Sequence, residues 1–163
     1  VGIVGAKLYY PDDTIQHAGV VIGMLGIAGH VYNGCFREDT GIFGRLKVRQ
    51  NVSAVTAAVL MIKKSVYLEV EGLDEEMFKV AFNDIDLCMK VISAGYEIIW
   101  TPYSELYHYE SKSRGSENTP EKYKRFQNEI RNFDKKWGMW LKDPFYNENL
   151  DLLKTYPVVK QED

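Results

Sequence analysis

Two hydrophobic periodicities alternate along the chain, and this alternation restricts the fold more than any other feature. Residues 54–62 form a continuous apolar run with β-branched side chains, which is typical of a short strand buried on both faces. Apolar residues then recur at helical spacing over residues 85–92; Asn83 can cap this helix and Gly95 supplies its C-terminal stop. Strands that alternate with helices predict an α/β fold, here a mixed sheet flanked by helices.

The remaining elements extend this pattern. Further strands are predicted over residues 1–10, 14–22, 96–100 and 105–109, and a short helix over residues 64–70. Six glycines lie between Gly23 and Gly44. This density predicts a mobile loop, of the kind that often forms a functional lid, rather than a sheet element.

The last predicted element is a long amphipathic helix that begins at Pro120, with Thr119 in the cap position. One apolar stripe is expected to pack while a basic face stays in water; its members are Tyr123, Phe126, Ile130, Phe133 and Trp137. Residues 112–142 hold nine Lys and Arg against four Asp and Glu, a local balance of +5 that leaves −8 for the rest. A basic helix could attract a nucleoside diphosphate or touch anionic lipid, although a solvated helix face is the simplest interpretation.

Composition indicates the class of protein. The 163 residues carry a net charge of −3, with 45% hydrophobic and 26% charged residues, as in soluble globular domains. The slightly acidic balance argues against a nucleic-acid partner, and no apolar run reaches the ~20 residues that span a bilayer. Cys35 and Cys88 form no metal or disulfide pattern, so a reducing, cytoplasmic location is the default. Dehydrogenase, P-loop, zinc-protease and serine-hydrolase motifs are absent, so these classes lose support.

Two segments contain side chains suited to chemistry. Asp84 stands at the first position of the predicted helix, where free N–H groups and the helix dipole favour a carboxylate that can accept a proton from a hydroxyl. Acidic residues are also common at helix starts, so this segment alone does not distinguish a general base from a residue that only stabilises the helix. His108 precedes a polar loop with Lys112 and Arg114. The imidazole could ligate a divalent metal or be structural, and the two cations could bind phosphate oxygens.

The order of several motifs is more specific than any one of them. The motifs occupy residues 1–8, 15–19, 53–58, 70–75, 82–88, 95–102 and 108–115. In this order they resemble the C-terminal half of a family-2 glycosyltransferase with the GT-A fold, over roughly residues 1–120. The resemblance implies an inverting enzyme that transfers a sugar from a nucleotide-diphosphate sugar to a saccharide or glycolipid acceptor, in the synthesis of a surface polysaccharide.

The same resemblance implies roles on the acceptor side. Asp84 would be the general base that deprotonates the acceptor hydroxyl, and Asp86 would support the acceptor or the start of the helix. A turn at Thr56 and Ala57 would form the acceptor-side wall. Asn83 stands where the family usually has Glu, so the capping ability is kept but a charge is lost. Acceptor preference is therefore expected to differ from the common pattern.

Metal and diphosphate binding are implied as well. His108 matches a histidine that completes the site of a divalent metal, Mg or Mn, in related enzymes. Lys112 and Arg114 would neutralise the leaving diphosphate. Family members bind the nucleotide with an N-terminal half that ends in an Asp-x-Asp motif, and no such motif follows a suitable strand here. The expectation is therefore a fragment that lacks the donor pocket and is inactive by itself.

The chain is expected to have two parts, and three functions are considered for it. Residues 1–118 would form the acceptor-side part of the catalytic domain, with residues 119–163 packed on it as a helix and tail. The expected location is cytoplasmic, at the inner face of the membrane if the basic helix makes a peripheral contact. The alternatives are a non-catalytic saccharide-binding or assembly module of the same fold, and a metal-dependent hydrolase that uses Asp84, Asp86 and His108.

Overall fold

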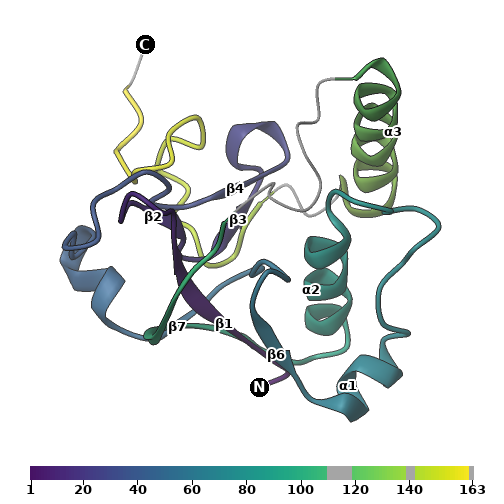
Figure 1. The fold of residues 1–163 in the computed structure, drawn as a ribbon, viewed down its shortest axis with the longest axis horizontal. Helices are drawn as coiled ribbons and strands as arrows, with labels where there is room; N and C mark the ends of the chain where they lie inside the picture. Colours follow the sequence, from purple (N-terminus) through teal and green to yellow (C-terminus); the bar gives the residue numbers. More distant parts are fainter. Residues whose placement is uncertain (110–118, 139–141, 162–163) are drawn as a thin grey trace.

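The computed structural model describes residues 1–109, 119–138 and 142–161. Its centre is a mixed sheet in which β1 (Ile3–Tyr9) pairs in parallel with β7 (Ile98–Tyr107). On the other edge of β1 lie two short antiparallel strands, β2 (Ile15–His17) and β6 (Leu60–Ile62), and β5 (Gln50–Asn51) pairs with β7. Helices α1, α2 and α3 gather on one side of the molecule (Figure 1). The predicted α/β class with a mixed sheet and flanking helices is confirmed.

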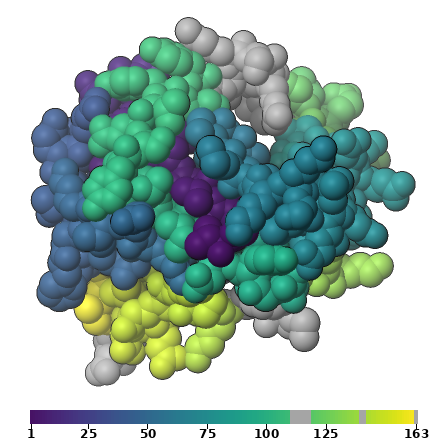
Figure 2. Space-filling view, turned by 90° about the horizontal axis from the view of Figure 1, so that it is seen from below, coloured from purple at the N-terminus to yellow at the C-terminus, as the bar shows by residue number. Residues whose placement is uncertain are grey.

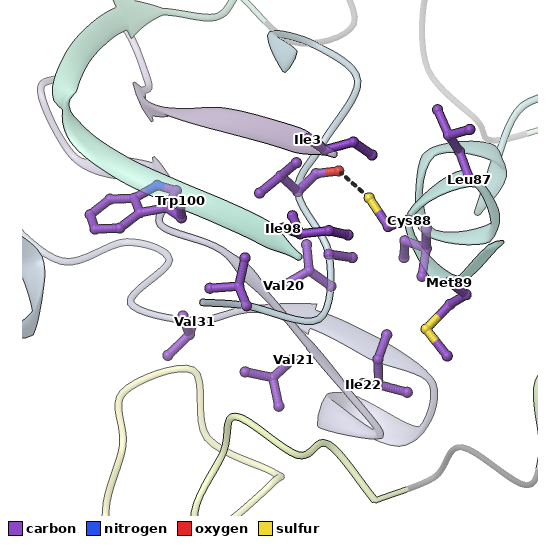
Figure 3. Packing of buried hydrophobic residues seen from close by; sticks show 14 of the residues in the cluster. Ile3, Val20, Val21, Ile22, Val31, Leu87, Cys88, Met89, Ile98 and Trp100 are labelled. Atoms are coloured by element: carbon purple, nitrogen blue, oxygen red, sulfur yellow. Dashed lines mark hydrogen bonds between the residues drawn. The ribbon is translucent and has the colours of Figure 1, made fainter. Parts of the chain in front are cut away.

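The hydrophobic core lies between the sheet and α2 (Asn83–Ser93). Ile3 from β1, Ile98 from β7 and Met89 from α2 are all almost fully buried, and Figure 3 shows them in one cluster. Cys88 lies in this cluster, where its thiol donates to the carbonyl of Val55 at 3.6 Å. Burial raises the pKa of this thiol to about 12, so Cys88 is a protonated core residue at neutral pH.

Strand β7 is longer than the sequence predicts. The two predicted extended segments form one continuous strand, and Thr101 and Pro102 lie within it. The register with β1 jumps at this point: Ala6 pairs with Thr101, whereas Lys7 pairs with Glu105. The three intervening residues bulge out of the ladder, which lets a proline reside in a strand without losing a hydrogen bond of the pairing.

The glycine-rich segment contains a sheet element, so the prediction of a loop over residues 23–44 is wrong there. Strand β4 (Ala28–His30) pairs with β3 (Val20–Ile22) in a two-stranded sheet. Gly29 is required by close packing, because a Cβ at this position would lie 2.7 Å from Cγ of Met24. Two 3₁₀ helices, η1 (Met24–Gly26) and η2 (Ile42–Lys47), lie before and after β4.

Two predicted strands are interrupted. The predicted strand over residues 14–22 divides into β2 and β3 at Gly19, whose φ of 103° turns the chain. The predicted buried strand over residues 54–62 is wrong in its first half, where a turn follows Val55 and only β6 is extended. Met61 in β6 is 76% exposed, so this strand is not buried on both faces.

The three helices lie close to where the sequence predicts them. Helix α1 spans Lys64–Glu69 and α2 spans Asn83–Ser93, but the N-cap of α2 is Phe82 rather than Asn83. Helix α3 spans Pro120–Trp137, and the hydroxyl of Thr119 accepts from the N–H of Lys122 as expected of a cap.

The apolar stripe of α3 packs only in part. Phe133 and Trp137 are buried, whereas Tyr123 and Phe126 stay exposed. Among the described helices, none is long and apolar enough to cross a bilayer.

The described part of the tail, residues 142–161, packs against the β3–β4 region (Figure 1), and seen from below its yellow atoms border the blue segment that precedes β5 (Figure 2). The N–H of Tyr32 donates to the carbonyl of Thr155 at 2.7 Å, and the N–H of Ile22 donates to Asp143 at 2.8 Å. The predicted division between residues 118 and 119 stays a prediction, since residues 110–118 lie outside the described ranges.

Candidate functional site

Asp84 and the Thr56–Ala57 turn, predicted from distant segments of the sequence, come into contact. The N–H of Ala57 donates to Oδ2 of Asp84 at 3.1 Å. Oδ1 of Asp84 accepts from the N–H of Ile85 at 2.9 Å. The hydroxyl of Thr56 accepts from the N–H of Ala58 at 3.3 Å and so closes the turn on its own backbone. Ala57 is exposed and Asp84 is half-buried, so the carboxylate is fixed in orientation and remains accessible.

Helix α2 begins one residue earlier than the sequence predicts, which makes Asp84 its second residue. Its cap residue, Phe82, adopts a φ of 64° and offers no side-chain hydrogen bond. The ring of Phe82 instead stacks on Phe126 at 5.7 Å between centroids and lies 5.4 Å from Phe133, both on α3. Packing from another helix, rather than a local capping residue, therefore determines where α2 starts.

The loop before this cap is held by one carboxylate of α3. Glu129 accepts from the N–H groups of Lys79 at 3.0 Å, Val80 at 3.1 Å and Ala81 at 3.0 Å. Arg125, one turn earlier on α3, lies 3.8 Å from the same carboxylate. The sequence analysis missed Glu129, although a charged residue between Phe126 and Phe133 on an apolar stripe is a signal that could have found it.

Asp86, predicted to support the acceptor or the start of the helix, faces the protein interior. It is fully buried, and Oδ1 accepts from Nε1 of Trp137 at 2.8 Å and pairs with Nζ of Lys136 at 2.8 Å. Oδ2 lies 3.7 Å from Nζ of Lys90. The Asp86 carboxylate thus ties α2 to α3, and its acceptor role stays a prediction.

Lys136 joins this network to the loop before α2. Its Nζ also pairs with Asp74 at 3.0 Å. Burial lowers the pKa of Lys136, but hydrogen bonds to Asp86 and Asp74 outweigh burial and leave the pKa above its ordinary value. Lys136 is therefore a permanent cation between two carboxylates.

His108 directly follows β7, and its ring is oriented by Gln16 of β2. Nδ1 of His108 lies 2.8 Å from Oε1 of Gln16, while Nε2 of Gln16 donates to the carbonyl of His108 at 3.3 Å. Because the amide nitrogen of Gln16 donates to the His108 carbonyl, its oxygen is the atom that faces Nδ1, and Nε2 is the ring nitrogen left outside this contact. A metal-ligating histidine usually contacts a neighbouring acceptor with one ring nitrogen and binds the metal with the other.

The described residues contain no group of three or more His, Cys, Asp or Glu that could hold a metal ion. Asp84, Asp86 and His108 therefore do not form the site that a metal-dependent hydrolase would need. Lys112 and Arg114, predicted to bind the diphosphate, lie outside the described residues. Asn83 is the first, half-buried residue of α2, and its predicted effect on acceptor preference stays a prediction.

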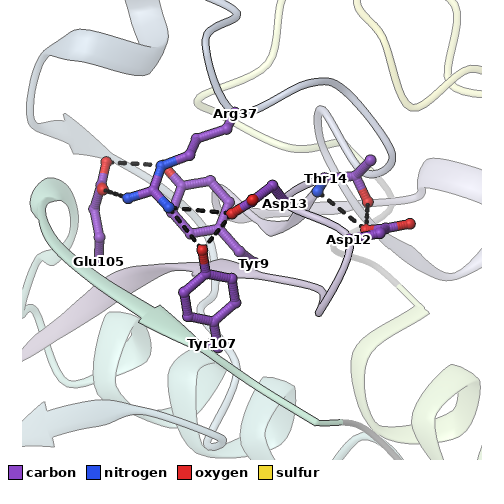
Figure 4. Close-up of polar contacts among 7 residues, drawn as sticks. All are labelled: Tyr9, Asp12, Asp13, Thr14, Arg37, Glu105 and Tyr107. Carbon is purple, nitrogen blue, oxygen red and sulfur yellow. Dashed lines mark hydrogen bonds and ion pairs between the residues drawn. The ribbon is translucent and has the colours of Figure 1, made fainter.

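A charged cluster, missed by the sequence analysis, lies where β1 and β7 end (Figure 4). The guanidinium of Arg37 pairs with Glu105 at 2.8 Å and Asp13 at 3.2 Å, and it donates to the hydroxyl of Tyr107 at 2.8 Å. It also lies 4.6 Å from the ring centroid of Tyr9. Hydrogen bonds from Tyr107 and Arg37 lower the pKa of Asp13. The cluster holds the two strand ends together immediately before His108.

A part-buried contact between two histidines links the two sheets. Nδ1 of His17 lies 2.9 Å from Nδ1 of His30, with the rings edge to face. Burial, and to a lesser extent the neighbouring His30, lower the pKa of His17 well below its ordinary value, so this ring is neutral at physiological pH.

Comparison with known proteins gives two curated relatives. The chain is 57% identical over 156 residues to the uncharacterized protein y4gI of Sinorhizobium fredii, and 34% identical over 164 residues to the O-antigen biosynthesis protein RfbC of Myxococcus xanthus. These matches cover 93% and 95% of this chain but only 17% and 12% of the relatives, so the chain spans less than a fifth of their length. No protein-family model and no solved structure matches the chain.

Proposed function

We propose that this chain forms the acceptor-side part of an inverting glycosyltransferase of family 2, with the GT-A fold, in surface polysaccharide biosynthesis. The catalytic unit would be a longer protein that supplies the donor-binding half. Its substrates would be a nucleotide-diphosphate sugar and a saccharide or glycolipid acceptor. The similarity to an O-antigen biosynthesis protein supports the pathway. The much greater length of both relatives supports the proposal that the catalytic unit is longer than this chain.

The observation that carries this proposal is the contact between Asp84 and Ala57. Family resemblance assigns one to the base and the other to the acceptor wall, and the structure holds them 3.1 Å apart. A general base must lie within hydrogen-bond reach of the proton it removes, so base and acceptor wall have to be neighbours. The first turn of α2 adds the positive end of a helix dipole beside the carboxylate.

The chemistry that follows is a single displacement. The Asp84 carboxylate takes the proton of the acceptor hydroxyl as the oxygen attacks the anomeric carbon. The new carbon–oxygen bond forms on the face opposite the leaving group, and the bond to the diphosphate breaks with its electron pair on the phosphate oxygen. Because Ala57 fixes Oδ2 by one hydrogen bond, the base does not need to find its orientation during the reaction.

A divalent metal, Mg or Mn, belongs to the proposal. When bound, it would neutralise charge on the leaving diphosphate. His108 fits such a group, since Gln16 contacts Nδ1 and leaves Nε2 for the metal, and further ligands would have to come from outside the described residues. Lys112 and Arg114 would assist by binding diphosphate oxygens.

The test is Asp84→Asn in the longer protein, assayed with a panel of nucleotide-diphosphate sugars and oligosaccharide acceptors. Transfer should fall by about 10³-fold while donor binding by calorimetry stays unchanged, because only the base is removed. Asp134→Asn, on the exposed face of α3, is the matched control and should keep full activity. Transfer that survives Asp84→Asn at a near-normal rate would show that Asp84 is not the base. Glycan binding without any turnover in the unmodified protein would favour a non-catalytic module.

A further inference from the structure

Glu129 is an unusual residue for the middle of a basic amphipathic helix. Only 3% of it is exposed, and a buried carboxylate is costly unless its charge is compensated. Its compensation comes mainly from backbone: three successive N–H groups, those of Lys79, Val80 and Ala81, point at its two oxygens. A carboxylate that binds three consecutive N–H groups fixes the conformation of that backbone segment.

The same face of α3 holds the rest of this loop. Nδ2 of Asn132 donates to the carbonyl of Met77 at 3.0 Å, and Lys136 pairs with Asp74 at 3.0 Å. The rings of Phe126 and Phe133 hold Phe82, the residue that follows the three bound N–H groups. The loop from Asp74 to Phe82 is thus attached to α3 at several points along its length.

We infer that Glu129 is a positioning residue for Asp84, an inference that rests on the proposed function. The last N–H that Glu129 binds belongs to Ala81, three residues before Asp84. The cap residue of α2, Phe82, makes no side-chain hydrogen bond, so the position of the helix start depends on the loop that precedes it. Glu129 fixes the backbone entering α2, and that backbone fixes where the Asp84 carboxylate meets the N–H of Ala57.

This coupling has a reporter that does not depend on activity. The amide proton of Ala57 lies on a different segment and contacts the Asp84 carboxylate directly, so its NMR shift reports where that carboxylate lies. Asp84→Asn in this 163-residue chain defines the shift when the charge is lost. Glu129→Gln keeps the size of the side chain but turns one oxygen into a donor that faces an N–H group.

In Glu129→Gln the Ala57 amide signal should move toward its position in Asp84→Asn, and its hydrogen exchange should accelerate. Amides of β1 and β7 should change much less. Asp134→Asn, on the same helix but exposed, should leave all these signals in place. If Glu129→Gln does not fold, Glu129→Asp provides the same test, because it keeps the charge but withdraws the carboxylate by one methylene.

In the longer protein, Glu129→Gln should lower kcat by about 10²-fold, as a displacement near 1 Å does, while the KM for the donor changes less than about twofold. An Ala57 signal that stays in place in the folded variant overturns the inference. Exchange that accelerates equally across β1, β7 and Ala57 also overturns it, since Glu129 would then stabilise the fold as a whole. Whether Asp84 is the general base is a separate question, which the transfer assay of Asp84→Asn answers.

Discussion

Lys136 pairs with two carboxylates, one of them fully buried, and its removal should be among the most destabilising single changes in this chain. Its Nζ lies 2.8 Å from Asp86 and 3.0 Å from Asp74. Lys136→Met keeps much of the stem length and its packing but removes the charge. Asp86 has no exposed surface, and among the described residues it would keep the Trp137 N–H at 2.8 Å and Lys90 at 3.7 Å.

The expected cost follows from this geometry. Removing one partner of a buried ion pair costs about 3–5 kcal/mol, because the remaining charge is left without compensation. Lys136 is 27% exposed and Lys90 remains nearby, so the lower end, about 3 kcal/mol, is expected. For a chain of this size that corresponds to a Tm lower by roughly 6–12 °C.

Urea denaturation followed by circular dichroism measures this loss, with Lys135→Met as the matched control. Lys135 neighbours Lys136 but is exposed, so its replacement should change the free energy of unfolding by less than about 0.5 kcal/mol. The double variant Lys136→Met with Asp86→Asn should recover part of the loss, since the buried charge is gone. Equal stability of the two single methionine variants would refute the argument that the ion pairs stabilise the α2–α3 contact.

Two further stability predictions concern the sheets. Gly5→Ala would place a Cβ 2.6 Å from Cβ of Val55, so it should lower the free energy of unfolding by about 1–3 kcal/mol, measured by urea denaturation. Adding Val55→Ala should restore part of this loss. A Gly5→Ala variant as stable as the parent would contradict the packing described. Burial keeps His17 neutral in the folded chain, whereas in the unfolded chain the same imidazole binds a proton near pH 6.5. Protons therefore stabilise the unfolded state, and the free energy of unfolding should fall as pH falls below 6.5. This fall should amount to at most about 1.4 kcal/mol per pH unit; His17→Gln should remove it, and an unchanged slope between pH 7 and 5.5 would exclude His17 as its source.

Local patterns predicted the elements that depend on local interactions. Strand β1 and the helices α1, α2 and α3 follow from periodicity and from the cap at Thr119. Strand β4 was not predicted, because glycine has a low propensity for strands. The close approach of Gly29 to Met24, which explains the glycine at this position, is visible in the folded chain alone. Periodicity also gave one strand over residues 54–62, since an apolar run carries no sign of where it leaves the sheet, and the turn at Thr56 and Ala57 was implied by the family resemblance alone.

The candidate site divides in the same way. Asp84, Thr56 and Ala57 were predicted as site residues from the resemblance, and the structure adds the hydrogen bond that joins Asp84 to the turn. Glu129 binds backbone N–H groups about fifty residues away, a contact that no spacing in the sequence encodes. Arg37 likewise contacts two distant segments, the end of β1 with its turn and the end of β7, so only the folded chain shows its role.

The attachment of the Lys79–Ala81 loop through its main chain has a consequence for variation. Every residue except proline offers the same N–H group, so the side chains at these three positions can be exchanged without disturbing the contact with Glu129. Position 129 has no such freedom, because only its carboxylate supplies the two oxygens. Related chains can therefore diversify the surface that this loop presents, and with it what the loop contacts, while the start of α2 keeps its place.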